Sequence, residues 1–151
     1  MSERSENVGT GIFDKLNVSN VTSLAVFGVY QDEAPEKKAD GTLVDFPFVV
    51  FQRVAPGDVL RSLGGSIVGE DDLWQVKALT DKLSSGAYSP RKLGALILTA
   101  CETALGATLT LSGGFETRLV RRSRDIPSYW ETLASGRRIL HQGFYLRIFT
   151  E

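Results

Sequence analysis

The sequence contains one cysteine, one histidine and one methionine in 151 residues. Because Cys101 is alone, no intrachain disulfide can form, and zinc or redox sites of the CxxC type are excluded. No apolar run approaches the roughly 20 residues that cross a bilayer, and the first residues carry no signal-peptide pattern. We therefore expect a protein that is made inside a cell, is soluble and contacts no membrane.

The chain also lacks an excess of charge of either sign, since 17 Lys and Arg oppose 18 Asp and Glu for a formal net charge of -1. This balance gives no global reason to expect a nucleic-acid partner, which would need a local basic patch. The length and the 42% hydrophobic content fit one globular domain. We expect residues 11–151 to form this domain, and residues 1–10, which are polar and contain glycine, to be a flexible arm.

Strand patterns occur at three places in the first half of the chain. The strongest is FPFVVFQRV at residues 46–54, in which Pro47 should mark the first residues of the strand or an edge position. Residues 24–30 favour a strand near their end, and residues 71–80 alternate apolar with polar side chains. Residues 58–69, which precede this alternating segment, could form a hairpin tip or a flap hinged at their Gly-Gly pair.

One helix is clearly delimited over residues 90–105. Ser89 is suited to the N-cap, a proline follows it, and Gly106 is suited to a left-handed cap at the C-terminal end. A short helix is also permitted at residues 12–16, and a short strand could follow the long helix at residues 107–111. Six side chains of the long helix fall on one face at helical spacing: Leu93, Leu96, Ile97, Ala100, Cys101 and Ala104.

The last third of the chain predicts two paired strands at residues 115–125 and 136–149. The loop between them, residues 126–136, begins at an Asp-Ile-Pro breaker. Together these patterns predict an α+β fold. It consists of a single, mostly antiparallel sheet of four to five strands packed by one long helix, with a short N-terminal helix.

No group of residues supports catalysis. His141 lies mid-strand without a second histidine or a cysteine cluster, so a packed or surface role is more common than that of a general base or metal ligand. Cys101 lies on the apolar helix stripe, where a thiol acts as a small inert hydrophobe. The acidic run at residues 70–72 is more often a solvated loop than a metal site. We therefore predict no enzymatic activity, no cofactor and no metal.

An arginine-rich region is the clearest charge feature. It comprises Arg118, Arg121, Arg122, Arg124, Arg137 and Arg138. Strand alternation would place all but Arg121 of the first four on one face, and pairing of the two strands near their loop would add the last two. The arginines could pair with carboxylates of the same chain, such as Glu116, Asp125 and Glu131. They could instead join subunits or contact a nucleic-acid backbone.

The loop of residues 31–45 is acidic and complements the arginines in sign. Its candidate contacts are Asp32, Glu33 and Glu36. A subunit with an acidic loop on one side and a basic strand on another can join head to tail, and such contacts close into a ring if the rotation allows. Tyr129 and Trp130 add aromatic side chains of the kind that anchor interfaces, unless they cover the end of the core.

The motifs also follow one another in a recognisable order. They are VY…AP from Val29 to Pro35, FPFVVFQ from Phe46 to Gln52, DLWQVKA from Asp72 to Ala78, the helix of residues 90–105, the Arg-rich strand closed by Asp125-Ile126-Pro127, and a closing strand that ends in FYLRI at Ile148. This ordered set, over about residues 24–149, resembles the tail-completion (tail-terminator) proteins of phages and prophages. The shared motifs are structural strands, and the family has no active site to transfer. The chain differs from the shorter family pattern in its longer loop at residues 31–45 and in its aromatic loop at residues 126–136.

The resemblance implies a subunit that forms a homohexameric ring at the head-proximal end of the tail tube. There it would stop polymerisation of the tube protein and join the tail to the head-tail connector or stopper protein. It implies a virion protein of the tail or neck, assembled in the host cytoplasm, with passive contact to DNA in the lumen at most. Two alternatives stay open. One is another neck component, such as the stopper or a head-completion adaptor. The other is a small nucleic-acid-binding module that uses the arginine-rich strand, with Phe115 and Tyr129 as stacking groups.

Overall fold

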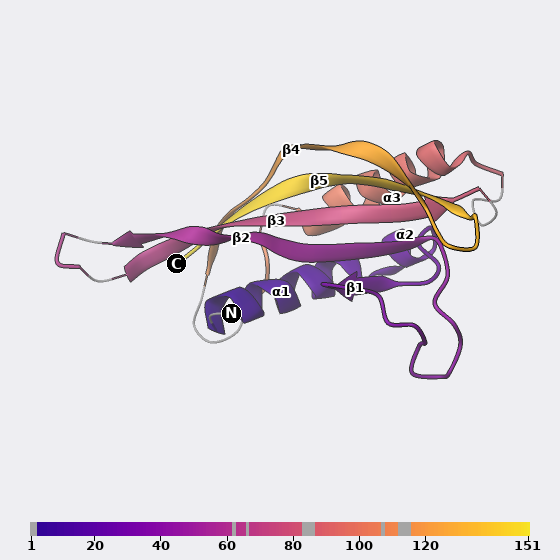
Figure 1. The fold of residues 1–151 in the computed structure, drawn as a ribbon. Coiled ribbons are helices and arrows are strands. Elements are labelled where there is room, and N and C mark those ends of the chain that lie inside the picture. The colour runs from indigo at the N-terminus through magenta and orange to yellow at the C-terminus, as the bar shows by residue number, and fades with distance from the viewer. Residues whose placement is uncertain (1–2, 62, 66, 83–86, 107, 112–115) are drawn as a thin grey trace.

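The computed structural model describes residues 3–61, 63–65, 67–82, 87–106, 108–111 and 116–151, without the side chains of residues 3–5, 55–61, 67, 68, 118 and 119. This part of the chain contains three helices and five strands (Figure 1). In chain order they are α1 (Glu3–Leu16), α2 (Ser19–Thr22), β1 (Val29–Gln31), β2 (Phe48–Arg61), β3 (Ile67–Asp81), α3 (Pro90–Leu105), β4 (Thr117–Thr132) and β5 (Arg138–Thr150).

All of these strands form one sheet in the order β1-β2-β3-β5-β4. The short β1 runs parallel to β2, and the other neighbouring strands are antiparallel. The predicted α+β fold, with a single and mostly antiparallel sheet, is therefore confirmed. Strands β1 and β4 are the two edges of the sheet, far apart in the sequence and on opposite sides of the molecule.

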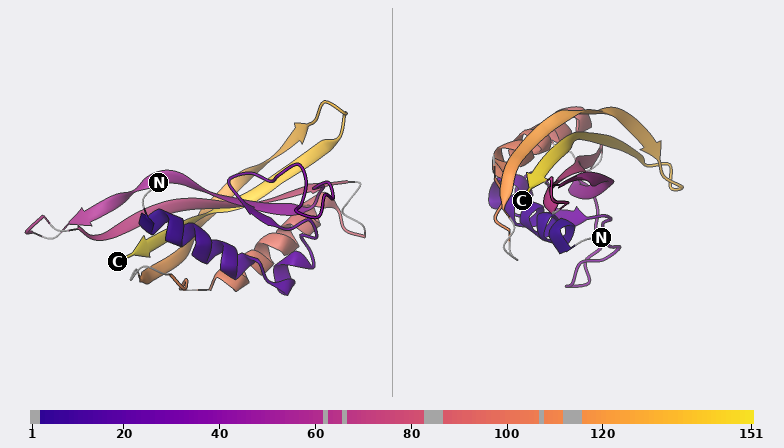
Figure 2. Two further views of the ribbon diagram at one scale, coloured as in Figure 1. Left: turned by 90° about the horizontal axis from the view of Figure 1, so that it is seen from below. Right: turned by 90° about the vertical axis from the view of Figure 1, so that its left-hand side faces the viewer.

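The helices α1 and α3 lie on one face of the sheet, and no helix of the described residues covers the other face (Figures 1 and 2). We call these the covered face and the open face. Side chains alternate between them, so that Trp74 and Phe144 are buried on the covered face while their neighbours Gln75 and Tyr145 lie on the open face. None of the described helices is long and apolar enough to cross a membrane.

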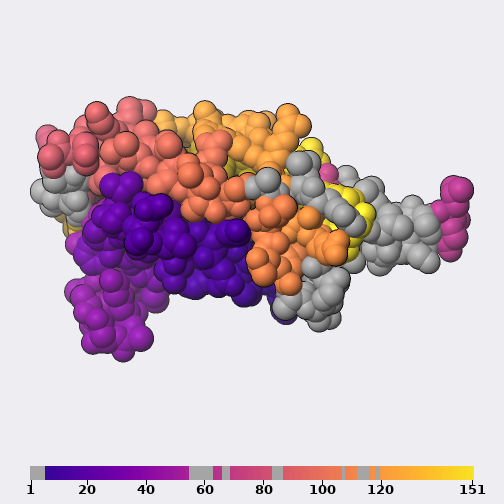
Figure 3. Space-filling model, turned by 180° about the vertical axis from the view of Figure 1, so that it is seen from behind, coloured from indigo at the N-terminus to yellow at the C-terminus, as the bar shows by residue number. Residues whose placement is uncertain are grey.

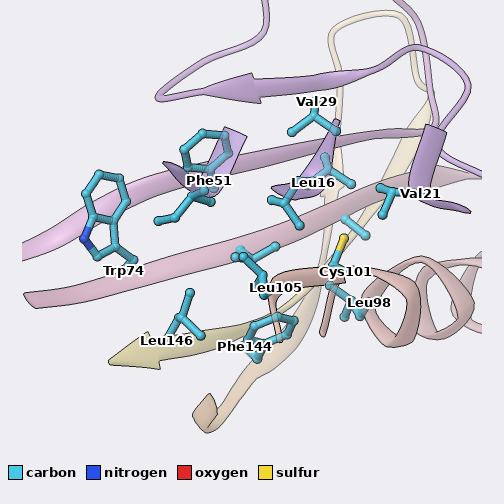
Figure 4. Packing of buried hydrophobic residues seen from close by; sticks show 14 of the residues in the cluster. Leu16, Val21, Val29, Phe51, Trp74, Leu98, Cys101, Leu105, Phe144 and Leu146 are labelled. Atoms are coloured by element: carbon cyan, nitrogen blue, oxygen red, sulfur yellow. The ribbon is translucent and has the colours of Figure 1, made fainter. Parts of the chain in front are cut away.

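The covered face and the helices share one apolar core (Figure 4). The predicted stripe of α3 faces this core, with Ile97 and Cys101 fully buried. The largest side chains of the sheet meet them there: the rings of Phe51 and Trp74 lie 6.2 Å apart between centroids. The alternation predicted for residues 71–80 is confirmed by the burial of every second side chain in that part of β3.

Both ends of α3 lie where the sequence predicts them. The side chain of Ser89 accepts a hydrogen bond from the backbone N–H of Lys92 at 3.2 Å. Gly106 follows the last turn with a φ of 62° and a ψ of -148°, so it ends the helix in an extended conformation at positive φ and not in the predicted left-handed cap. This conformation costs glycine little because it has no Cβ. These local caps delimit the helix independently of its packing.

Gln142 is a polar residue among the apolar side chains that β5 sends to the covered face. It lies opposite Gly94 of α3, where a Cβ would come within 1.9 Å of the Gln142 Oε1 atom. The Nε2 atom of Gln142 donates to the backbone carbonyl of Arg91 at 3.3 Å. Glycine thus allows α3 to approach β5 closely, and the first turn of the helix supplies a partner for the amide.

Strands β2 and β3 extend as a hairpin beyond the rest of the sheet (Figures 1 and 2), and the tip of this hairpin is the outermost part of the molecule at that end (Figure 3). Their pairing continues to Arg61 and Ile67, so the hairpin alternative predicted for residues 58–69 is confirmed. Strand β5 accompanies β3 only as far as Glu70. Near the tip, the side chain of Leu63 is fully exposed.

The prediction of a flexible arm at residues 1–10 was wrong for the part that the structure describes. Helix α1 begins at Glu3, and Val8 is 0% exposed. The polar composition of this segment conceals a repeat of Val8, Ile12 and Leu16, which lie one turn apart on the same side of α1. Because one apolar side chain per turn is enough to dock a helix that packs on one side only, composition alone gave the wrong result.

The loop predicted at residues 126–136 is mostly strand. Strand β4 continues through Pro127 as far as Thr132. An edge strand tolerates proline because the missing N–H can face away from its neighbour. Two register shifts interrupt the pairing with β5 here, one between Arg122 and Asp125 and one between Ile126 and Tyr129, and Pro127 falls within the second.

The strand predicted at residues 107–111 is also wrong, because the described residues 108–111 form none. Leu109 is nevertheless buried, and a side chain satisfies its backbone. The hydroxyl group of Thr117 donates to the carbonyl of Leu109 at 2.9 Å and accepts from its N–H at 3.1 Å. A single hydroxyl therefore replaces the strand partner that the pattern suggested.

Arg137 anchors the turn between β4 and β5 to the opposite half of the sheet. Its guanidinium group forms ion pairs with Asp81, which is 1% exposed, and with Asp45 Oδ1 at 2.7 Å. It also lies 5.2 Å from the ring centroid of Phe46. The hydrogen bond to Asp81 is the main cause that raises the pKa of Arg137 above its ordinary value. This contact holds the C-terminal end of the acidic loop against the sheet.

Replacing Arg137 with alanine should lower the free energy of unfolding by about 1–3 kcal/mol, because buried Asp81 loses a charged hydrogen-bond donor. The matched control is Arg138→Ala, which removes a guanidinium group that lies over the ring of Trp130 and should cost about 1 kcal/mol or less. Urea unfolding curves measure both effects. Equal losses for the two variants would contradict the anchoring role of Arg137.

The thiol of Cys101 should resist modification in the folded protein. Burial raises its pKa from 9.0 to about 12, and the thiolate is the reactive form. We expect disulfide reagents at pH 8 to label Cys101 slowly in buffer and rapidly in denaturant. Because the folded-state pKa is raised, the stability that the neutral thiol contributes is complete below pH 9.0 and is lost as the pH rises toward about 12. Rapid labelling of the native protein would contradict this packing.

Candidate assembly interface

The open face carries a hollow of about 300 Å³ beside the β1 edge. Asp32 and Glu33, which directly follow β1, form its acidic rim. The N–H of Asp32 donates to the carbonyl of Phe51 at 2.9 Å, which places this rim beside β2. The remaining lining residues come from β2, β3, β5 and the loop after β1: Ala34, Phe48, Val50, Gln52, Gln75, Lys77, Leu79 and His141. The hollow therefore combines an acidic margin with an amphipathic floor.

Four side chains from three strands form a connected group across the open face. Lys77 Nζ donates to the hydroxyl group of Tyr129 at 3.0 Å. The ring of Tyr129 stacks on that of His141, with centroids 4.4 Å apart and planes inclined by 11°. His141 Nε2 lies 3.2 Å from Glu131 Oε1. His141 is therefore a packed strand residue held by β4, and the described residues contain no group of three metal-ligating side chains.

Arg122 links β4 to α3 on the covered face. It forms ion pairs with Glu102 of α3 and with Asp125, which follows the register shift in β4. Its guanidinium carbon lies 4.9 Å from the ring centroid of Phe144. The hydrogen bond to Asp125 is the main cause that raises the pKa of Arg122. Pairing within the same chain therefore accounts for this arginine.

Arg121 and Arg124 lie on the open face. Arg121 is the register partner of Arg147, and the guanidinium carbon of Arg124 lies 5.0 Å from the ring centroid of Tyr145. The prediction that Arg122 and Arg124 share a face was wrong, because the register shift between them reverses the alternation of the strand. No carboxylate of the described side chains forms an ion pair with either Arg121 or Arg124.

The six arginines do not form the single patch that the sequence suggested. In the register of the sheet, Arg138 of β5 lies opposite Thr132 at the turn, whereas Arg122 of β4 lies opposite Leu146 of β5. Arg138 and Leu146 are roughly 25 Å apart along β5 at about 3.3 Å per residue. Arg137 is engaged with Asp81 and Asp45, as described above, and the side chain of Arg118 lies outside those that the structure describes.

The predicted acidic contacts lie at the opposite edge of the sheet from Arg121 and Arg124. Asp32, Glu33 and Glu36 are exposed. No cationic group of the described side chains forms an ion pair with any of them. Asp32 and Glu33 border the hollow, whereas Glu36 lies further along the loop. The structure thus places two oppositely charged groups at opposite edges of the sheet.

Tyr129 and Trp130 belong to β4 and not to a loop. They are half exposed, with Tyr129 packed on His141 on the open face. Trp130 projects to the other side, where its ring lies under the guanidinium group of Arg138. Adjacent residues of a strand point in opposite directions, so the two aromatic side chains cannot form one anchor.

Sequence reasoning missed the role of the acidic run at residues 70–72. It lies within β3, and Asp72, which is 1% exposed, pairs with Arg53 at 2.8 Å. Asp71 pairs with Arg147 of β5 on the open face. The sequence shows the alternation of this segment but does not show which arginines pair with its aspartates. These arginines come from β2 and β5, whose positions on either side of β3 depend on the whole sheet.

The fold resembles solved structures, although no family model and no curated protein matches the sequence. One chain, from a structure described as "Virion of native gene transfer agent (GTA) particle", superposes with a TM-score of 0.59 at 15% identity over 99% of both chains. A second solved chain superposes with a TM-score of 0.53 at 10% identity, over 97% of this chain and 96% of that one. At these identities the likeness shows the fold alone. The whole chain has a fold that also occurs in a virion particle.

Proposed function

We propose that this protein is a structural component of a virion or a virion-like particle. The observation that carries the proposal is the likeness over 99% of both chains to a chain from the gene transfer agent virion. A likeness confined to a common core would weigh less, because small α+β folds serve many unrelated functions. Here the helices, the sheet and the projecting hairpin all fall within the matched length.

Within such a particle, we propose the role of a tail terminator. The protein would form a ring at the head-proximal end of the tail tube, stop polymerisation of the tube and join the tail to the head connector. The ordered strand motifs support this role, from VY…AP at Val29 to FYLRI at Ile148. The partners are then further copies of the chain, the tube protein and the connector or stopper protein. The role requires no catalysis.

Two surface features suit a ring subunit. Among the described residues, the sheet ends in β1 on one side and in β4 on the other, and these edges carry opposite charges on the open face. Different patches meet in a head-to-tail contact, so such contacts can close into a ring. In addition, the β2–β3 hairpin projects beyond the body and carries exposed Leu63, which offers an apolar contact to a neighbour along the tube axis.

Removing this protein from its particle should give overlong tails that are not attached to heads, because nothing would stop the tube. Electron microscopy of particles from a deletion strain measures tail length, and restoring the intact gene is the control. DNA-leaking heads beside tails of normal length would instead indicate the stopper or a head-completion adaptor. Normal particles would contradict any neck function.

Arg121 and Arg124 specifically favour a second function, contact with a nucleic-acid backbone. Such contacts strengthen steeply as salt falls, because each neutralised phosphate releases counterions. We expect the isolated protein to bind double-stranded DNA no more tightly than about 100 µM at physiological salt, which is the weak end of non-specific binding. A salt series by fluorescence anisotropy, repeated with Arg121→Ala/Arg124→Ala, tests this. Micromolar binding that the variant loses would favour the nucleic-acid-binding module.

A further inference from the structure

We propose that neighbouring copies of this chain join edge to edge, so that Asp32 and Glu33 of one subunit pair with Arg124 and Arg121 of the next. The inference rests on the proposed ring and specifies its contact. It uses the two edges of the sheet: β1, with the acidic rim of the hollow, and β4, with the two arginines. The partner of each edge is the opposite edge of an identical subunit.

Both edges have backbone groups available for such a contact. Strand β1 covers only three residues of β2, so beyond Phe51 the outer side of β2 has no strand beside it among the described residues. Within the described ranges, strand β4 has a strand neighbour, β5, on one side only. The topology also makes β4 antiparallel to β1 and β2, since β1 is parallel to β2 and the three later pairings each reverse direction. Antiparallel neighbours are the more common and slightly more stable arrangement.

The two charged groups lie at the same level along the strands. Partner positions cross the sheet from Gln31 through Phe51, Val76 and Phe144 to Asp125. The next level crosses Gln52, Gln75 and Tyr145, and Arg124 covers the ring of Tyr145 at its far end. At its near end lies Asp32, the residue directly after the last paired residue of β1. A rotation about an axis parallel to the strands preserves these levels. It would therefore bring Arg124 of one subunit beside Asp32 of the next without any shift along the strands.

The two charged groups also lie on the same face. Asp32 and Glu33 border the hollow of the open face, together with Lys77 and Leu79. Arg124 reaches its position through the register shift that turns it toward Tyr145. Cyclic symmetry keeps the open faces of all subunits in the same orientation relative to the axis. Groups on one face at opposite edges are therefore the ones that meet.

The proposed contact between subunits uses charged side chains that form no ion pair within the described part of their own chain. Arg122 and Arg137 are engaged with carboxylates of their own chain, and so is Arg147 with Asp71. Among the described side chains, Arg121 and Arg124 have no such ion pair, nor do Asp32 and Glu33. Interfacial arginine–carboxylate pairs select the partner and its orientation, because like charges would otherwise face each other.

Aromatic side chains also lie at the two edges, two same-face layers away, beyond the layer that crosses Val50, Lys77 and Gly143. Phe48, Leu79, His141 and Tyr129 are successive register partners across the sheet. Half-exposed Tyr129 thus ends the level that begins at Phe48 in the floor of the hollow. In the edge-to-edge arrangement, Tyr129 of one subunit lies next to the hollow of its neighbour, where its ring can cover apolar surface.

Charge reversal of each edge tests the proposal. Asp32→Arg/Glu33→Arg makes both edges basic, and Arg121→Glu/Arg124→Glu makes both edges acidic. Each variant alone should need at least about 10-fold more protein to form the wild-type ring, because like charges then meet at every contact. An equimolar mixture should restore the ring with alternating subunits, which an even-numbered ring permits. The variant with all four changes should assemble by itself. Native mass spectrometry measures each state.

Two control variants carry the same changes of charge elsewhere. Glu6→Arg/Asp14→Arg alters exposed positions of α1, and Arg91→Glu/Arg138→Glu alters exposed positions away from the open-face edges. Both should assemble like the wild type. Thermal unfolding of every variant confirms that it is folded before its assembly is compared. Reversal variants that form wild-type rings would overturn the proposed contact, and so would a folded four-fold variant that remains monomeric.

The wild-type protein separates this contact from the proposed function. If the wild type forms rings and the charge-reversal variants assemble equally well, the edge-to-edge pairing is overturned and the terminator role is not affected. A wild-type chain that stays monomeric even in the presence of tail proteins would overturn both. Rings with the predicted charge dependence, together with tails of normal length in the deletion strain, would support the contact and remove the terminator role.

Discussion

Burial of one face of a single sheet against α1 and α3 is the constraint on which the rest of the structure depends. Because side chains alternate along a strand, committing Trp74 and Phe144 to the core also sends Gln75 and Tyr145 to the other side. The open face is therefore a direct consequence of the core. Its side chains are not simply solvated, since Lys77, Tyr129 and His141 contact one another across three strands. A surface ordered in this way is suited to a contact with another protein.

Backbone irregularities in β4 decide what its arginines can do. One register shift leaves Arg122 on the covered face, where Glu102 and Asp125 hold it, and turns Arg124 toward the open face. An uninterrupted strand would have placed both on the same side. The arginine-rich segment is thus divided into residues that hold the fold together and residues that remain available at an edge. Net charge and composition do not predict which arginines belong to each group.

The fold is shared with another protein, whereas the surface contacts are particular to this chain. The likeness over 99% of both chains to a chain of a virion particle concerns the fold. The contacts belong to this chain alone: an acidic rim at the β1 edge, two arginines at the β4 edge and a hairpin that projects beyond the body. A subunit with two different, complementary edges can form the heterologous contacts that close into a ring of identical copies.

The sequence by itself determined the features whose causes are local. Helix α3 lies between Ser89 and Gly106 because its caps are short-range hydrogen bonds and backbone conformations, and the alternation of β3 needs only its own residues. Docking of α1 and continuation of β4 through Pro127 were predicted wrongly, because both depend on what packs alongside. The tertiary structure alone decided which arginines stay without a carboxylate. That outcome depends on the order of the strands and on a register shift, and both are set by the pairing of residues distant in the chain.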